Sequence, residues 1–276
     1  MEKLLEKINL RYVIFALGGL LAAGLITLAV LLMLPKPQPA PAYDGPPSGA
    51  EFLEENPFGP EDFALSEDGF LSCLAAESVL GIDVSAYQGE IDWSAVKNAG
   101  VEFVFIRVGG RGTTEGGLYT DDCAQRYYEG AKQAGLQVGA YFFSQAITPE
   151  EAAEEAQFTL EQIRGWTLEL PVVYDWEWVS EDSRTANMDQ ATLTQCTKVF
   201  CQQIEDAGLE AAVYFNHSQG TQLLDLRELT DYSFWLARYE TSPDFPCRVD
   251  YWQYSCTGTV PGIETDVDLN LFFPVS

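Results

Sequence analysis

Carboxylate side chains interrupt three of the short hydrophobic runs in the chain. Asp83 lies in Gly-Ile-Asp-Val-Ser, and Asp268 lies in Val-Asp-Leu-Asn. Asp175 and Glu177 share the run Tyr-Asp-Trp-Glu-Trp. Side chains two residues apart on a β-strand point to one face, so this pair is expected side by side, roughly 6.6 Å apart along the strand. Burial raises the pKa of a carboxyl group, as a general acid requires. The pattern therefore predicts acid–base chemistry by carboxyl groups.

A second interpretation is that these four acids are surface or salt-bridged groups. The chain has 42 acidic residues to place, and ion-pair networks also perturb pKa values. Taken singly, each acid fits either interpretation. Their joint occurrence on three separate runs favours the catalytic one.

Aromatic side chains lie on or beside the same runs. An aromatic face beside a carboxylate is a common way to hold a sugar ring. Aromatic residues on strands also fill cores, and alternation lets only about half of them face one side. The candidates for contact with a substrate are Tyr87, Tyr141, Tyr214, Trp235 and Trp252.

The elements that must position these side chains alternate between two kinds of run. Strand-like runs rich in β-branched and aromatic residues span 80–85, 103–108, 137–144, 172–179, 211–216, 234–239, 249–255 and 267–272. Helix-like runs span 93–99, 122–134, 149–163, 189–207 and 218–229. This alternation is typical of a parallel α/β sheet, and eight strands suit a closed barrel. In such barrels the active site lies at the carboxyl ends of the strands.

The last strands cannot follow the regular alternation. Fewer than ten residues separate Tyr239 from Val249, too few for a full crossover helix. The last three strands must therefore be joined by loops or pair differently. The predicted fold is an α/β domain over residues 79–276, an irregular TIM-like (β/α)5(β)3 barrel.

An apolar run without charges precedes this domain. Residues 13–34 give about 33 Å of helix, enough to cross a bilayer core of about 30 Å. Three basic residues precede the run and one follows it closely, so the positive-inside bias places the tail 1–12 in the cytoplasm. The alternative is a cleavable signal peptide, but its apolar region usually has only about 7–15 residues. We therefore expect a single-pass transmembrane helix in the cell membrane, with the catalytic domain outside the cytoplasm.

Residues 35–78 are expected to form an extracytoplasmic linker. The stretch 35–50 is rich in Pro, Ala and Gly and lacks hydrophobic periodicity, which favours an extended spacer. Between Pro37 and Ile82 there are nine acidic residues and no Lys or Arg, which favours a solvated segment.

The composition argues against several classes of partner. A formal charge of −27 makes binding to nucleic acid unfavourable. With one histidine and no C-x-x-C pair, neither a metal nor another cofactor is expected. His217 could line a groove, but a lone histidine at a helix start is more often structural. All six cysteines follow the apolar run; Cys247 and Cys256 are the preferred disulfide pair, and free buried thiols are the alternative elsewhere.

Taken together, the motifs resemble those of the glycoside hydrolase family 25 lysozymes. They are Gly-Ile-Asp-Val-Ser-Ala-Tyr-Gln-Gly at 81–89, Ile-Asp-Trp at 91–93, Tyr-Phe-Phe at 141–143, Pro-Val-Val-Tyr-Asp-Trp-Glu at 171–177, Trp-Gln-Tyr-Ser at 252–255 and Val-Asp-Leu-Asn at 267–270. They occur in the family's order and span nearly all of 80–273. The resemblance implies an N-acetylmuramidase that cuts the β-1,4 bond between N-acetylmuramic acid and N-acetylglucosamine, in an acidic groove on a barrel with five helices and three closing strands.

The resemblance also implies a role for each acid. Glu177 would protonate the leaving oxygen, and Asp175 would position the substrate or stabilise a charged intermediate. Asp83 and Asp268 would tune those two groups. The expected partner is the glycan strand of peptidoglycan, bound by a monomeric catalytic domain. The two-residue spacing leaves the stereochemical course open among retention, inversion and assistance by the sugar's acetamido group.

Two other functions compete with this one. A non-catalytic wall-binding or anchoring module would grip glycan without cutting it, but all four acids are intact. A chitin-type glycosidase would normally carry a D-x-x-D-x-D-x-E strand motif, whereas this chain has only the shorter D-x-E.

Overall fold

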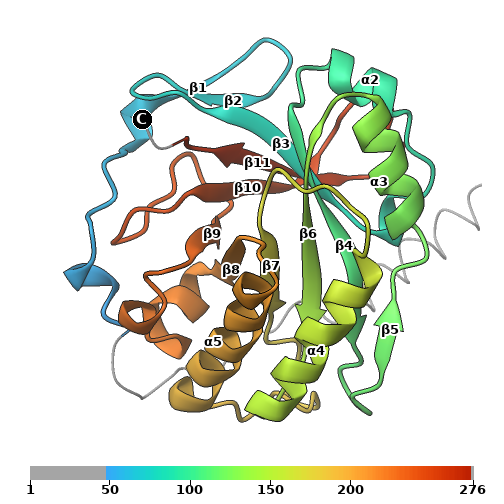
Figure 1. Cartoon of the computed structure of the whole chain (residues 1–276). Helices are drawn as coiled ribbons and strands as arrows, with labels where there is room; N and C mark the ends of the chain where they lie inside the picture. Colours follow the sequence, from blue (N-terminus) through green and yellow to red (C-terminus); the bar gives the residue numbers. More distant parts are fainter. Residues whose placement is uncertain (1–47, 275–276) are drawn as a thin grey trace, which may run out of the picture. The chain divides into compact units, whose positions relative to one another are not determined.

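The structure, a computed structural model, describes residues 48–274, and their centre is a closed barrel of eight strands (Figure 1). The sheet order is β3–β11–β10–β9–β8–β7–β6–β4, and pairing of β3 with β4 closes it. The barrel strands are β3 (Val79–Val84), β4 (Phe103–Arg111), β6 (Gln137–Ser144), β7 (Val172–Trp176), β8 (Ala211–Asn216), β9 (Ser233–Ala237), β10 (Tyr251–Gly258) and β11 (Val267–Phe272). A short strand, β5 (Leu118–Thr120), adds to the outer edge of β4. Each strand-like run in the sequence corresponds to one barrel strand, so the predicted closed eight-stranded barrel is confirmed.

Among the eight barrel strands, only the last one reverses direction. The barrel pairs from β3 through β4, β6, β7, β8 and β9 to β10 are parallel, whereas β11 is antiparallel to both of its neighbours. Loops alone join β9 to β10 and β10 to β11, as the short spacing requires. Because β11 runs backwards, its first residues lie level with the carboxyl ends of the parallel strands.

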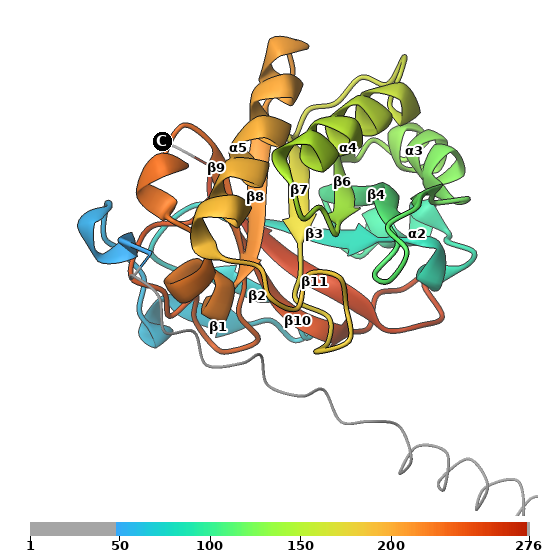
Figure 2. The same cartoon turned by 90° about the horizontal axis from the view of Figure 1, so that it is seen from below.

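Four α-helices of the described part lie outside the barrel wall (Figure 2). They are α2 (Trp93–Asn98), α3 (Ala124–Gln133), α4 (Pro149–Gln162) and α5 (Gln190–Asp206). Side chains of Asp92, Thr148 and Asp189 cap α2, α4 and α5 by accepting backbone N–H groups of the first turn. Gly135 and Gly208 follow α3 and α5 with φ of 79° and 83°, the left-handed conformation that ends a helix.

The predicted helix over 218–229 does not form as one element. The chain makes a π-helical turn, η4 (Gln219–Leu223), and then a 3-10 turn, η5 (Leu226–Glu228). Leu224 between them is extended, with ψ of 143°. The Asp225 side chain accepts a hydrogen bond from the next turn, and such a local bond competes with helix continuation.

Aromatic rings fill the barrel interior. Phe105 stacks on Trp235 with ring centroids 4.5 Å apart and meets the edge of Tyr251 at 5.2 Å. Phe103 packs edge-on against Phe105 at 5.8 Å. The lumen is therefore a packed core, and a substrate can be bound only at its end.

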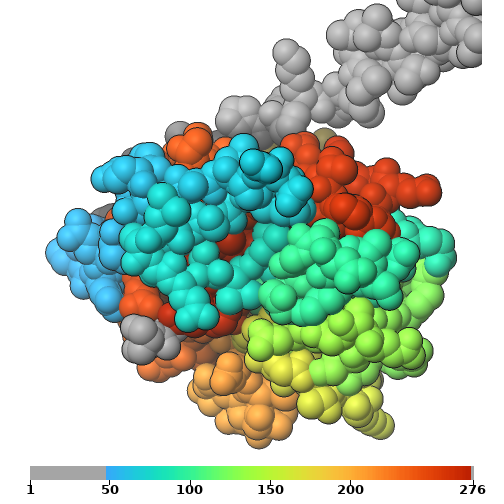
Figure 3. Space-filling view, turned by 90° about the horizontal axis from the view of Figure 1, so that it is seen from above, coloured from blue at the N-terminus to red at the C-terminus, as the bar shows by residue number. Residues whose placement is uncertain are grey.

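Residues 48–78 differ from the expected linker, because much of this stretch folds onto the barrel. The hairpin of β1 (Phe63–Leu65) and β2 (Leu71–Cys73) places the Phe63 ring 4.9 Å from Trp252. Just before it, Phe58 lies 4.9 Å from the Phe273 ring. Figure 3 shows this segment in blue, with atoms of the C-terminal part visible beside it in red and orange. Burial of its aromatic side chains outweighs the solvation expected from its acidic residues.

Three remaining expectations concern the N-terminus and the cysteines. The predicted tail 1–12 and span 13–34 lie outside the described residues. Within residues 48–274, no helix has both the length and the apolar character needed to cross a membrane. The expected disulfide does not form: all six thiols are free, with Cys247 buried and Cys256 exposed.

Candidate active site

The four predicted acids meet at one end of the barrel. Asp83 in β3, Asp175 in β7 and Glu177 just after β7 stand at carboxyl ends of parallel strands, and Asp268 stands at the reversed start of β11. They line one cleft of about 300 Å³. The other lining residues are Ser85, Tyr87, Gln88, Arg107, Tyr141, Tyr214, Trp235, Tyr239, Gln253, Cys256 and Asp266.

Asp83 is fixed by two amide side chains. The Nε2 atom of Gln253 and the Nδ2 atom of Asn270 each donate to Oδ2 of Asp83 at 2.8 Å. Burial raises the pKa of Asp83 to about 6, although these two hydrogen bonds favour its ionised form. Asp83 is thus a rigid group whose charge changes near neutral pH.

Asp175 is buried without a complete set of partners. Its Oδ1 atom has no hydrogen-bond partner within residues 48–274. Burial raises its pKa well above the usual range, with Glu177 and Asp83 adding repulsion and Arg107 opposing them. A buried, unsatisfied carboxyl oxygen costs free energy, so a native site that keeps one needs a functional reason.

Glu177 stands one residue beyond the end of β7, slightly outside the strand predicted for it. Burial raises its pKa to about 7, and the charge of Asp83 contributes. Burial also raises the pKa of Asp268 to about 8, with repulsion from Asp83 and Glu177. Taken together, the four carboxyl groups therefore hold more protons near neutral pH than isolated carboxyl groups would, although Asp83 is mostly ionised there.

Two buried glutamines hold the backbone on which Glu177 stands. Gln145, after β6, donates through Nε2 to the carbonyl oxygen of Glu177 at 2.8 Å. Gln219, after β8, donates through Nε2 to the carbonyl oxygen of Trp176 at 2.9 Å. Thr185 in turn donates to Oε1 of Gln145 at 3.0 Å. Where the β7 ladder ends, side chains from both neighbouring strand ends therefore replace the missing ladder bonds.

Four of the five predicted aromatic residues line the cleft. Tyr87 stands at the rim, with 80% of its surface exposed, whereas Trp235 is only 1% exposed and forms the floor. Tyr141 and Tyr214 lie between these extremes, and the Tyr214 hydroxyl donates to Oε1 of Gln253 at 3.1 Å.

The fifth aromatic residue, Trp252, does not line the cleft. It is fully buried on the outer side of β10, where its Nε1 atom donates to the Arg238 carbonyl oxygen at 2.7 Å. Strand alternation explains the difference: Tyr251 and Gln253 take the lumen side, so Trp252 between them must face outward.

Several polar residues in the cleft or just beneath it were not predicted from the sequence. Strand alternation could have predicted Gln253 and Asn270, since each lies on the same strand face as a residue of the barrel interior. Alternation could also have predicted Arg107, because it lies on the same face of β4 as Phe103 and Phe105. Gln145 lies in a loop beyond β6, where no periodicity marks it.

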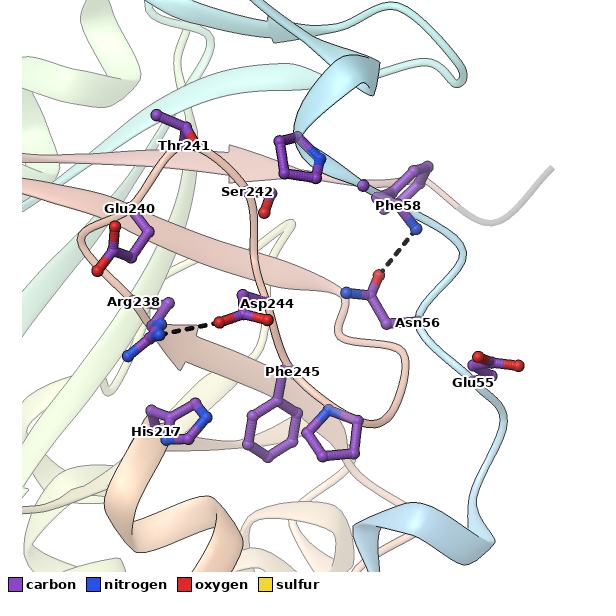
Figure 4. A pocket seen from close by; sticks show the side chains of 13 residues that line it. Glu55, Asn56, Phe58, His217, Arg238, Glu240, Thr241, Ser242, Asp244 and Phe245 are labelled. Carbon is purple, nitrogen blue, oxygen red and sulfur yellow. Dashed lines mark hydrogen bonds and ion pairs between the residues drawn. The ribbon is translucent and has the colours of Figure 1, made fainter.

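A larger hollow of about 680 Å³ lies elsewhere on the surface (Figure 4). His217, Arg238 and Asp244 contribute to it, together with residues of the N-terminal segment. The Arg238 guanidinium pairs with Asp244 at 2.9 Å, and the His217 ring packs edge-on against Phe245. Its acids are not at strand ends, so the smaller cleft is the candidate for chemistry. No group of His, Cys, Asp or Glu in the described part is arranged to hold a metal ion.

A cleft of carboxyl groups at the strand ends of a closed α/β barrel has the acid–base groups that hydrolysis of a glycosidic bond requires. A sequence model of Glycosyl hydrolases family 25 matches residues 82–263, about two thirds of the chain, and the chain belongs to that family.

Individual relatives agree with this assignment. The chain is 33% identical to the autolytic lysozyme of Clostridium acetobutylicum, over 70% of this chain and 55% of the relative. It is 29% identical to lysozyme M1 of Streptomyces globisporus, over 95% and 91% of the two chains. The crystal structure of a bacterial lysozyme from Streptomyces coelicolor is 29% identical, with a TM-score of 0.58 over 71% of this chain and 92% of the other. The chain thus spans just over half the length of the first of these relatives.

Proposed function

We propose that this chain is a peptidoglycan hydrolase, an N-acetylmuramidase that cleaves the β-1,4 bond between N-acetylmuramic acid and N-acetylglucosamine. The observation that carries the proposal is the pairing of Glu177, whose pKa is raised to about 7, with Asp175 in one acidic cleft. The names of the relatives, lysozymes and an autolysin described with a synthetic peptidoglycan ligand, support the substrate class.

In the proposed reaction, Glu177 donates its proton to the leaving glycosidic oxygen as the C–O bond breaks. Neighbouring carboxyl groups that share a proton supply one acid and one carboxylate. Burial raises the pKa of Asp175 well above its usual range and Arg107 opposes this increase only in part, so the role of Asp175 as the carboxylate follows from the resemblance to the family and not from these shifts. That negative charge stabilises the positive charge that develops on the sugar ring in the transition state. Asp83 tunes both groups through its charge, and Asp268 contributes to the raised pKa of Asp175.

Product chemistry tests the activity. Purified walls are digested with the full chain, reduced with borohydride and analysed by mass spectrometry. An N-acetylmuramidase leaves N-acetylmuramic acid at each new reducing end, so muramitol is the expected product. Glucosaminitol would indicate cleavage of the other glycan bond. If no reducing end appears although the chain binds walls, the non-catalytic wall-binding function replaces the proposal.

The proposal includes a membrane anchor at residues 13–34. It is supported by the length of this apolar run and by the basic residues before it. The enzyme would then act on wall next to the cell's own membrane. In fractionated cells the full chain should sediment with membranes and be cut by protease added outside. Release of a mature chain beginning near Tyr43 would contradict the anchor.

A further inference from the structure

Arg107 is placed in the cleft by the geometry of β4. It follows Phe103 and Phe105 on the strand face that points into the barrel. The pairing of β4 with β6 shifts register between Arg107 and Gly109. Such a bulge bends a strand and redirects the side chain beside it, and bulges are common next to active sites. Arg107 therefore reaches the cleft instead of the packed lumen.

The charge of Arg107 is unusual for its surroundings. Among the residues that line the cleft it is the only Lys or Arg, whereas five lining residues are Asp or Glu. A cleft with this composition, in which carboxyl groups outnumber cationic donors, does not attract anions. Peptidoglycan is nevertheless a glycan in which alternate sugars carry a 3-O-lactyl group, whose carboxyl is either free or amide-linked to a peptide. The cleft therefore needs a local donor for that group.

The guanidinium group of Arg107 is held in place through two of its three nitrogen atoms. Its Nε and Nη2 atoms lie 2.9 and 2.8 Å from Oδ2 of Asp121. Asp121 is itself held by the backbone N–H groups of Ala86 and Cys123, each at 3.0 Å. The guanidinium lies over the ring of Tyr87, 5.4 Å from its centroid. Nη1 forms no hydrogen bond with any residue in 48–274, so this orientation leaves a rigid donor unused.

We propose that Arg107 determines specificity by donating from Nη1 to a lactyl oxygen of the muramyl residue, so that the cleft prefers this sugar to N-acetylglucosamine. This inference rests on the proposed function. A guanidinium suits the role because it donates to both a free carboxylate and an amide-linked carbonyl. The other function of Arg107, support of the Ala86 loop through Asp121, would not discriminate between the two sugars.

The test measures binding of two single sugars to the full chain purified in detergent. N-acetylmuramic acid and N-acetylglucosamine differ only in the lactyl group, so the ratio of their dissociation constants isolates that contact. Wild type should bind N-acetylmuramic acid about ten-fold more tightly, the effect of one charge-assisted hydrogen bond. Arg107→Gln should bring the ratio close to one, with N-acetylglucosamine affinity changed less than about two-fold. Arg107→Lys, which keeps the charge but loses the fork, should restore the preference only in part.

The matched control is Arg126→Gln, because Arg126 is also ion-paired, to Glu90, but does not line the cleft. Its ratio should equal that of wild type. The inference is overturned if wild type binds the two sugars equally well. It is also overturned if Arg107→Gln weakens the binding of both sugars by the same factor, which is the result expected of a purely structural arginine. If Arg107→Gln does not fold, Arg107→Lys decides: an unchanged ratio overturns the inference, and a reduced one supports it. Wall digestion by wild type is measured separately, so failure of the proposed function is recognised on its own.

Discussion

Asp83 and Asp268 are direct cross-strand partners in the antiparallel pair of β3 and β11. Like charges placed opposite one another destabilise a sheet, so a fold selected for stability alone would avoid this pairing. Asp83 also raises the pKa of both Asp268 and Glu177. The arrangement keeps protons in the cleft near neutral pH, and this property leads to the first prediction.

Activity should fall as pH rises through about 7, because burial and Asp83 raise the pKa of the proton donor Glu177 to about that value. Above it Glu177 is ionised and has no proton to give. Asp83→Asn removes a negative charge, which makes ionisation of Glu177 easier and lowers its pKa. The alkaline limb of kcat/KM should therefore move to lower pH, while exposed Asp122→Asn leaves it in place. If the alkaline limb of Asp83→Asn coincides with that of wild type, Asp83 does not raise the pKa of Glu177.

Gln145 should act on turnover without touching the substrate. Its Nε2 atom holds the Glu177 carbonyl oxygen, and Gln145→Glu keeps the shape but replaces that donor by a carboxyl oxygen. Because small displacements of a catalytic group are costly, kcat should drop about 10- to 100-fold with KM nearly unchanged. The alkaline limb of the pH profile should shift as well, which a merely destabilised fold would not cause. Wild-type kcat in a folded Gln145→Glu variant would argue against the positioning role.

The hairpin packed on the barrel should contribute to stability. Phe63→Ala removes an aromatic ring that contacts Trp252, and we expect a loss of about 2 kcal/mol in the free energy of unfolding. Phe52→Ala is the matched control, because Phe52 is 73% exposed. It should change stability by less than about 0.5 kcal/mol. Urea denaturation measures both, and equal stabilities would mean that the hairpin is only loosely attached.

Strong local patterns predicted most of this architecture. The β-branched runs predicted all eight barrel strands, and the rule that active sites lie at strand carboxyl ends predicted that the four acids meet. Three features could not be predicted from such patterns. Trp252 faces outward because a single register choice on β10 decides its side. Residues 48–78 have no periodicity, so the contacts of Phe58 and Phe63 arise only from the tertiary fold. The donor Gln145 lies in a loop and the donor Gln219 begins the turn η4, and the partners of both depend on how the neighbouring strands end.

Loss of the proton of Glu177 tests the central claim most directly. Glu177→Gln keeps the shape of the side chain but cannot act as an acid, so hydrolysis of purified walls should fall by about 10²–10⁴. Wall binding should persist, and the melting temperature should not fall, since the substitution removes a buried carboxyl group. Asp175→Asn should also impair turnover, because it removes the charge that stabilises the transition state. The deciding measurement is the rate at which folded Glu177→Gln releases reducing sugar from wall. A rate at least 100-fold below wild type is predicted, and a rate equal to wild type would contradict the catalytic assignment.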